Sequence, residues 1–199
     1  MYNNINEIEW DKLPNKFIIK CNHDSGSTIV CKDKSKFDKA NCILKLNKWM
    51  SIDFTFRNGF ESHYHWIDRK IIVEELLEDE KQKESLYDYK FWCFNGEPKL
   101  YTINDGHGHG DIMYYKMDDS EYNLYNIRNN SKYKKPNNFN LMVEYSKKLS
   151  KLFKFVRVDF YEVNNKVYLG ELTFTPGACV FNYKNPKDNI LVGDMLKIN

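Results

Sequence analysis

Alternating apolar and polar residues near the end of the chain predict a β-hairpin. The apolar positions of this pattern are Val156, Val158, Phe160, Leu172 and Phe174. A period of two is typical of strands that bury one face. Between the two runs, the sequence Asn-Asn-Lys at 164–166 supplies residue types that tolerate a tight turn.

The register of this hairpin follows from the same pattern, because a slip of one residue would divide the apolar set between the two faces. In that register the exposed face carries two opposed pairs, Asp159 with Glu171 and Arg157 with Thr173. The two carboxylates would lie roughly 5 Å apart at their Cβ atoms. Opposed like charges destabilise a sheet, so the pattern predicts a bound cation, and Mg²⁺ suits carboxylate and phosphate oxygens. The alternative is a structural hairpin whose carboxylates are neutralised by Arg157 and a lysine.

A second hairpin is predicted near the start of the chain, where the short apolar strands Phe17–Lys20 and Thr28–Cys31 flank the turn-forming run CNHDSGS. Its loop contains Ser25, Gly26 and Ser27, and free backbone N–H groups in such a loop can surround phosphate oxygens. Lys20 directly precedes the loop, and a lysine is a point charge suited to phosphate. The loop is therefore a candidate phosphate site.

Apolar residues at helical spacing predict two helices. The first is capped by Asp33 and runs to about Met50, and the second spans Asn138–Phe153. The stripes are Phe37, Ala40, Ile43 and Leu44 in the first helix, and Leu141, Met142, Tyr145, Leu149 and Leu152 in the second. The second stripe is expected to face a sheet.

Two further strand regions are predicted. Lys70–Leu77 begins as an apolar strand and then becomes acidic. Asp88–Phe94 and the PKLYTI run after it predict a hairpin, because the dipeptide Asn-Gly at 95–96 is a strong turn signal. Four histidines are interpreted without a metal: His63 and His65 as surface residues of an extended segment, and His107 and His109 as part of a mobile glycine-rich loop.

Length and composition narrow the class of protein. The 199 residues suffice for one sizeable domain or two joined lobes, and a net charge of +2 gives no electrostatic footprint for nucleic acid. No apolar run approaches the roughly 18 residues needed to span a bilayer, and the start shows no secretory signal pattern. The five cysteines are odd in number and lack CxxC spacing, which favours reduced thiols in a cytoplasmic protein.

Three stretches resemble a known family. The pattern RVDFY-x₉-ELTFTPG resembles the catalytic hairpin of ATP-grasp ligases, and LPNKFIIKCNHDSGS and DYKFWCFNGEPKL resemble the TupA-like ATP-grasp family, named for teichuronopeptide synthesis. The resemblance implies an α+β ATP-grasp fold of two lobes, each with a mainly antiparallel sheet and helices, with the nucleotide between them. It implies a lead-in segment at 1–15, a smaller lobe at 16–77, and a larger lobe at 86–199 containing the catalytic hairpin 156–177.

The resemblance also implies site residues. Arg157 would act on the transferring phosphoryl group, and Asp159, Glu171 and Thr173 would hold Mg²⁺, with Thr173 standing where the family usually has Asn. The residues implied for ATP are Lys20, Ser25, Gly26, Ser27 and Lys90 at the phosphates, Glu74, Glu75, Leu76 and Leu77 at the adenine, and Glu78 or Asp79 at the ribose. Phe60 occupies the place of a family arginine, and the family begins well before this chain does, so the chain is expected to be a shortened member or a fragment.

By this resemblance the protein is a cytoplasmic, ADP-forming ligase that uses ATP and Mg²⁺. It would join an amino acid or amine to a uronic-acid carboxylate of a cell-surface polysaccharide, as in capsule synthesis, through an acyl phosphate. The alternatives are a glycosyltransferase or other polysaccharide-biosynthesis enzyme, since paired carboxylates also serve glycosidic chemistry, and a degenerate nucleotide-binding module. Oligomeric state does not follow from the sequence.

Overall fold

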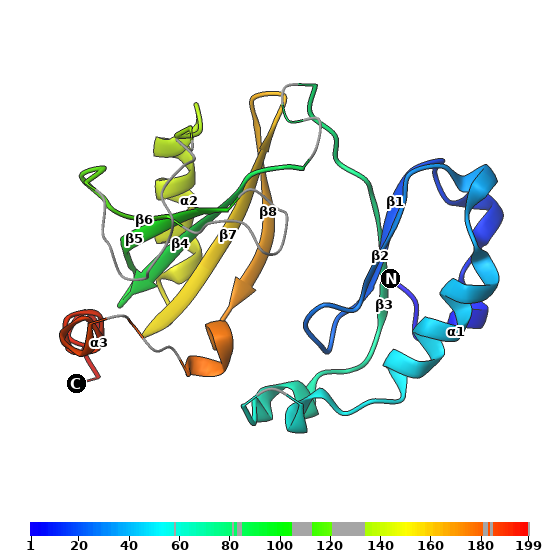
Figure 1. Cartoon of the computed structure of the whole chain (residues 1–199), viewed down its shortest axis with the longest axis horizontal. Coiled ribbons are helices and arrows are strands. Elements are labelled where there is room, and N and C mark those ends of the chain that lie inside the picture. Colours follow the sequence, from blue (N-terminus) through cyan, green and yellow to red (C-terminus); the bar gives the residue numbers. More distant parts are fainter. Residues whose placement is uncertain are drawn as a thin grey trace. The chain divides into compact units, whose positions relative to one another are not determined.

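The computed structural model describes residues 1–57, 59–80, 82, 85–104, 113–120, 134–180, 183 and 185–198. His107 and His109 lie outside these residues. The chain forms two compact units, Met1–Leu77 and Glu78–Asn199 (Figure 1). All five cysteines are free thiols. Within the described ranges, every helix is too short or too polar to cross a bilayer.

The first unit is built on a three-stranded antiparallel sheet with the strand order β2–β1–β3. The strands are β1 (Phe17–Cys21), β2 (Thr28–Cys31) and β3 (Ile71–Glu75), as labelled in Figure 1. Burial alternates along β1, so Phe17, Ile19 and Cys21 face the core and Lys20 faces the other way. The lead-in segment is part of this unit: Tyr2 pairs with Ile71, and Ile8 and Leu13 are buried in the core.

Helix α1 (Lys39–Met50) covers that core, but its start and its buried face differ from the predictions. Asp38 caps α1, whereas Asp33 caps the short 3₁₀ helix η3 (Lys34–Lys36). Cys42 and Leu46 are the buried residues of α1, one turn apart, so Leu44 lies on the opposite side and is 70% exposed. The predicted apolar stripe through Leu44 is therefore wrong.

The segment containing His63 and His65 is also different from the prediction. It forms the 3₁₀ helix η5 (Ser62–Trp66) rather than an extended segment. The ring of Tyr64 packs edge-on against that of Phe54, with the ring centroids 5.0 Å apart, and this contact holds the helix against η4 (Phe54–Phe56). His65 Nδ1 lies 2.6 Å from Asp53 Oδ2 at the surface.

The second unit is built on a five-stranded antiparallel sheet with the order β6–β5–β4–β7–β8. Its strands are β4 (Asp88–Phe94), β5 (Glu97–Asn104), β6 (Met113–Lys116), β7 (Phe155–Val163) and β8 (Lys166–Thr173). The sequence had not predicted β6. Helix α2 (Phe139–Ser150) packs on one face of the sheet (Figure 1). Helix α3 (Pro186–Gly193) contributes Val192 to a cluster on the other face, with Trp92, Phe94, Leu100 and Tyr114. Leu152 follows the end of α2 and is 89% exposed, so its predicted burial is wrong.

The register of the β7–β8 hairpin confirms the prediction: Arg157 pairs with Thr173, Val158 with Leu172, and Asp159 with Glu171. Asn164 and Asn165 both have positive φ (51° and 61°), as a type I′ turn requires. The pairing then shifts beside Gly170, where a Cβ atom would lie 2.9 Å from the ring of Tyr161. A glycine is needed at this bulge because the opposite strand approaches so closely.

Candidate functional site

The polar face of β4, β7 and β8 gathers the charged residues of the hairpin. Val156, Val158 and Phe160 lie in the core under α2. Because side chains alternate along a strand, Arg157 and Asp159 between them face the other side of the sheet. Lys90 of β4 pairs directly with Asp159, and Asp159 pairs with Glu171. Three adjacent strands therefore place Lys90, Asp159 and Glu171 in one row.

Arg157 connects this row through its guanidinium group. Its Nε donates to Asp159 Oδ1 at 2.7 Å, and its Nη2 donates to Asp159 Oδ2 at 2.6 Å. The same Nη2 lies 2.9 Å from Glu171 Oε1 and 3.0 Å from Thr173 Oγ1. Thr173 in turn donates to Glu171 Oε1 at 2.6 Å. The planar fork of the arginine thus orients all three residues that were implied for Mg²⁺.

Lys90 supplies a second positive charge. Its Nζ donates to Asp159 Oδ2 at 2.7 Å and also to Asp88 Oδ2. The Asp159 side chain is only 2% exposed, whereas Glu171 is 61% exposed. The prediction that both carboxylates lie exposed is therefore wrong for Asp159. A buried carboxylate needs counter-charges and hydrogen bonds, and Arg157 and Lys90 provide both. Neutralisation by Arg157 and a lysine is the arrangement expected of a structural hairpin.

The charge state of Arg157 is set by its neighbours. Burial opposes the charged form, but the hydrogen bonds and charge of Asp159, with further help from Glu171, outweigh it and raise the pKa of Arg157. The guanidinium therefore stays cationic, which suits a group that stabilises a phosphoryl group in transfer.

Asp88 belongs to the same cluster and was not singled out from the sequence. Its Oδ2 accepts from Lys90, while its Oδ1 is buried and has no hydrogen-bond partner in the described part of the chain. Burial raises the pKa of Asp88, and the charge of Lys90 opposes this effect. The signal in the sequence was the Asp-x-Lys spacing in DYKFWCF, which puts both side chains on one face of a strand.

The donor set on this face fits Mg²⁺. Asp159, Glu171 and Thr173 offer two carboxylates and one hydroxyl, all hard oxygen ligands. Among the described residues, no group of three or more His, Cys, Asp or Glu side chains is arranged to hold a metal by itself. Mg²⁺ does not need one, because it commonly takes one or two carboxylates and completes its shell with water and substrate phosphates.

In the first unit, Lys20 lies near the end of β1 and the loop 22–27 follows the strand. Lys20 Nζ pairs with Glu74 Oε2 at 2.6 Å, so one of the acids implied for adenine already has a lysine partner. Ser25 and Gly26 are exposed at the tip, and Gly26 has a φ of 96°. Ser27 is buried and donates to Asp24, so its hydroxyl serves the loop itself.

The segment after β3 carries the other residues implied for adenine. Glu75 ends β3 and is exposed, and Leu76 and Leu77 are half-buried. The Leu76 N–H donates to the Lys16 carbonyl at 3.3 Å. Since this amide is engaged, a base bound here would use other backbone groups of the segment.

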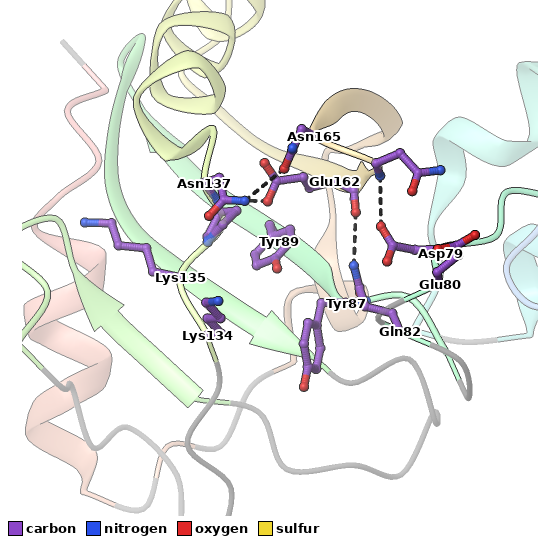
Figure 2. Close-up of a pocket in the computed structure, with 12 residues that line it drawn as sticks. Asp79, Glu80, Gln82, Tyr87, Tyr89, Lys134, Lys135, Asn137, Glu162 and Asn165 are labelled. Atoms are coloured by element: carbon purple, nitrogen blue, oxygen red, sulfur yellow. Dashed lines mark hydrogen bonds between the residues drawn. The ribbon is translucent and has the colours of Figure 1, made fainter.

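A cavity of about 450 Å³ lies elsewhere in the second unit, beside the start of α2 (Figure 2). Its lining includes Tyr87 and Tyr89, Lys134 and Asn137. Of the residues implied for ATP and Mg²⁺, Asp79 is the one that lines it, and its Oδ2 accepts from the backbone N–H of Asn164 at 2.8 Å. The cavity is therefore not where the charged residues of β4, β7 and β8 converge.

Glu162, at the wall of this cavity, serves the fold. Asn138 at the start of α2 makes no side-chain cap of its own. Instead, Glu162 accepts from the backbone N–H groups of Asn137 and Asn138, both at 2.9 Å, and from Asn138 Nδ2 at 2.6 Å. Figure 2 shows Glu162 beside Asn137. A strand residue thus caps the helix that covers the sheet.

Glu162→Ala is therefore expected to lower the free energy of unfolding by about 1–3 kcal/mol, because the two backbone N–H groups directly before α2 lose their acceptor. Urea denaturation at constant m-value measures the change. Glu144→Ala is the matched control: Glu144 lies on α2, pairs at the surface with Lys148 and should change stability by less than about 0.5 kcal/mol. Equal losses in both variants would contradict the cap.

Comparisons with known proteins place this geometry in context. A model of the family described as TupA-like ATPgrasp matches residues 1–197. The structure resembles that of D-alanine–D-alanine ligase from Bacillus anthracis complexed with ATP, with 15% sequence identity and a TM-score of 0.50 over 97% of this chain and 53% of that chain. A second structure of that ligase gives 17% identity and a TM-score of 0.47, over 98% of this chain and 58% of that chain.

The chain thus spans about half the length of the ligase that it resembles. No curated protein matches it. At this identity the likeness shows the fold, which is α+β ATP-grasp, and the predicted fold class is confirmed.

Proposed function

Because the chain belongs to the TupA-like ATPgrasp family, as its motifs predicted, we propose that it is an ATP-dependent ligase that joins a carboxylate to an amine. The observation that carries the proposal is the cluster of Arg157, Asp159, Glu171, Thr173 and Lys90 on one face of three adjacent strands. It combines hard oxygen ligands for Mg²⁺ with two cations that suit phosphate oxygens.

The binding roles divide between the two units. In the first unit, Lys20 and the N–H groups of Ser25, Gly26 and Ser27 bind phosphate oxygens, and the segment from Glu74 to Leu77 binds the adenine. In the second unit, Lys90 binds a phosphate. Asp159, Glu171 and Thr173 hold Mg²⁺, which when bound neutralises phosphate charge.

The reaction has two steps. A carboxylate oxygen of the acceptor attacks the γ-phosphorus of ATP, the bond to the β-phosphate oxygen breaks, and ADP leaves. The acyl phosphate that forms is then attacked at its carbonyl carbon by the amine, which loses a proton as inorganic phosphate departs. Arg157 contacts the phosphoryl oxygens during transfer, because its fixed fork and permanent charge stabilise the charge that develops there.

We propose the acceptor class from the resemblance to the family, not from the geometry of the site. In this proposal the carboxylate belongs to a uronic acid of a cell-surface polysaccharide and the amine to an amino acid or related compound. The reaction takes place in the cytoplasm, where ATP is available. The family match over residues 1–197 supports this choice.

The proposal is tested by measuring ADP release with ATP and Mg²⁺ in a matrix of uronic acids and amines. We expect ADP and phosphate in equal amounts, only when a suitable carboxylate and amine are both present. Release of a nucleoside diphosphate from a sugar nucleotide without ATP would favour a glycosyltransferase instead. ATP binding without ADP release across the matrix would favour a non-catalytic nucleotide-binding module.

A further inference from the structure

Lys90 lies between two carboxylates. Its Nζ donates to Asp88 Oδ2 and, at 2.7 Å, to Asp159 Oδ2. Asp88 and Lys90 are two residues apart on β4 and therefore share a face, and Asp159 is the direct partner of Lys90 on β7. All three side chains are largely buried, at 17%, 15% and 2% exposure respectively.

Charge is unevenly divided in this cluster. Three carboxylates, those of Asp88, Asp159 and Glu171, face the two cations Lys90 and Arg157. Arg157 already donates to both oxygens of Asp159, so Lys90 is the second cation on that carboxylate. For Asp88, in contrast, Lys90 is the one hydrogen-bond donor within the described residues, and Asp88 Oδ1 is buried without a partner.

This arrangement matters if Asp159 is to bind a divalent ion. The Lys90 ammonium group would be repelled by an ion held on Asp159, and strongly so where water is scarce. A lysine with no other counter-charge would compete with the ion for Asp159. Asp88 offers that counter-charge without moving, since its Oδ2 already accepts from Lys90.

We propose that Asp88 is the positioning residue of Lys90: it holds the ammonium group on this face and thereby frees Asp159 for Mg²⁺. The inference rests on the proposed Mg·ATP site and adds a residue to it. Asp88 touches neither the metal nor the nucleotide, and acts through Lys90. Its charge, rather than its shape, is the property that matters.

The test is Asp88→Asn, which keeps the shape and leaves an amide oxygen for Lys90 while removing the charge. Calorimetry measures ATP binding at a series of Mg²⁺ concentrations and with a chelator. We expect the Mg²⁺ concentration for half-maximal ATP binding to rise about tenfold, a coupling typical of residues in one network. Binding of metal-free ATP should be unchanged or tighter, because the variant carries one negative charge fewer. A purely structural role would weaken both.

One further variant restores the charge at position 88, and another serves as a control. Asp88→Glu restores the charge and should return the Mg²⁺ requirement most of the way to that of the parent, even if Asp88→Asn folds poorly. Asp119→Asn is the matched control, because Asp119 pairs with Lys135 at an exposed position of the same unit and the chemical change is the same.

The outcomes separate the inference from the proposed function. If the parent chain binds ATP with a Mg²⁺ requirement that Asp88→Asn leaves unchanged, the positioning role is wrong and the ligase proposal stands. The same conclusion follows if Asp88→Glu binds Mg·ATP no better than Asp88→Asn. If the parent chain shows no Mg²⁺-dependent ATP binding, both the positioning role of Asp88 and the ligase proposal are wrong.

Discussion

Arg157→Lys is expected to reduce the rate of ADP release at least about a hundredfold, the usual cost of removing a positioned donor from a charge-stabilising site. Arginine here donates to Asp159 through two nitrogens and reaches Glu171 and Thr173 with one of them. Lysine keeps the charge but offers a single ammonium group, which cannot hold this fork and also contact phosphoryl oxygens.

A coupled assay for ADP measures the effect, and calorimetry with Mg·ATP shows whether binding survives, as we expect. Arg69→Lys is the control, since Arg69 donates to the Met50 carbonyl in the first unit and undergoes the same change of side chain. Near-normal turnover in Arg157→Lys would contradict the proposed role of Arg157 in phosphoryl transfer.

Asp159→Asn is expected to lose both stability and Mg·ATP binding. Asp159 is almost fully buried and forms ion pairs with both Lys90 and Arg157. Removing its charge leaves Arg157 and Lys90 without their shared partner, and breaking a buried pair in this way costs about 3–5 kcal/mol. Urea denaturation measures the first loss, and the shift of melting temperature with Mg·ATP measures the second.

Glu171→Gln separates the two effects. Glu171 is mostly exposed, so its amide should leave the stability of the metal-free protein within about 0.5 kcal/mol of the parent. The thermal shift produced by Mg·ATP should nevertheless become much smaller, because one of two carboxylate ligands is gone. Glu144→Gln, an equally superficial change on α2, should keep the full shift. An undiminished shift in Glu171→Gln would remove it from the metal site.

The hairpin could be predicted from the sequence because the residues that determine it are close together in the chain. The alternation from Val156 to Phe160 and from Leu172 fixes which residues share a face, and two asparagines supply the positive φ of the turn. The charge balance is not local. Lys90 lies 69 residues before Asp159 and reaches it only because β4 pairs with β7. The pattern therefore predicts the correct face for Asp159 and Glu171, but it does not predict the burial of Asp159 or the part played by Asp88.

The other errors have similar physical causes. Two aspartates, Asp33 and Asp38, can each cap a helix, and the chain uses both, one for a 3₁₀ turn and one for α1. The alternating histidine and aromatic residues at 63–66 resemble a strand, but packing of Tyr64 on Phe54 favours a tight helix. Strand β6 is only four residues long, with no alternation of its own to reveal it.

The most direct test of the ATP site is a calorimetric titration of the unchanged chain with ATP and with GTP, each with and without Mg²⁺. We expect one ATP to bind per chain, with affinity that depends on Mg²⁺. GTP should bind much more weakly, because we propose that the Glu74–Leu77 segment binds the adenine base. No binding of ATP in Mg²⁺, or equal binding of ATP and GTP, would contradict the assignment.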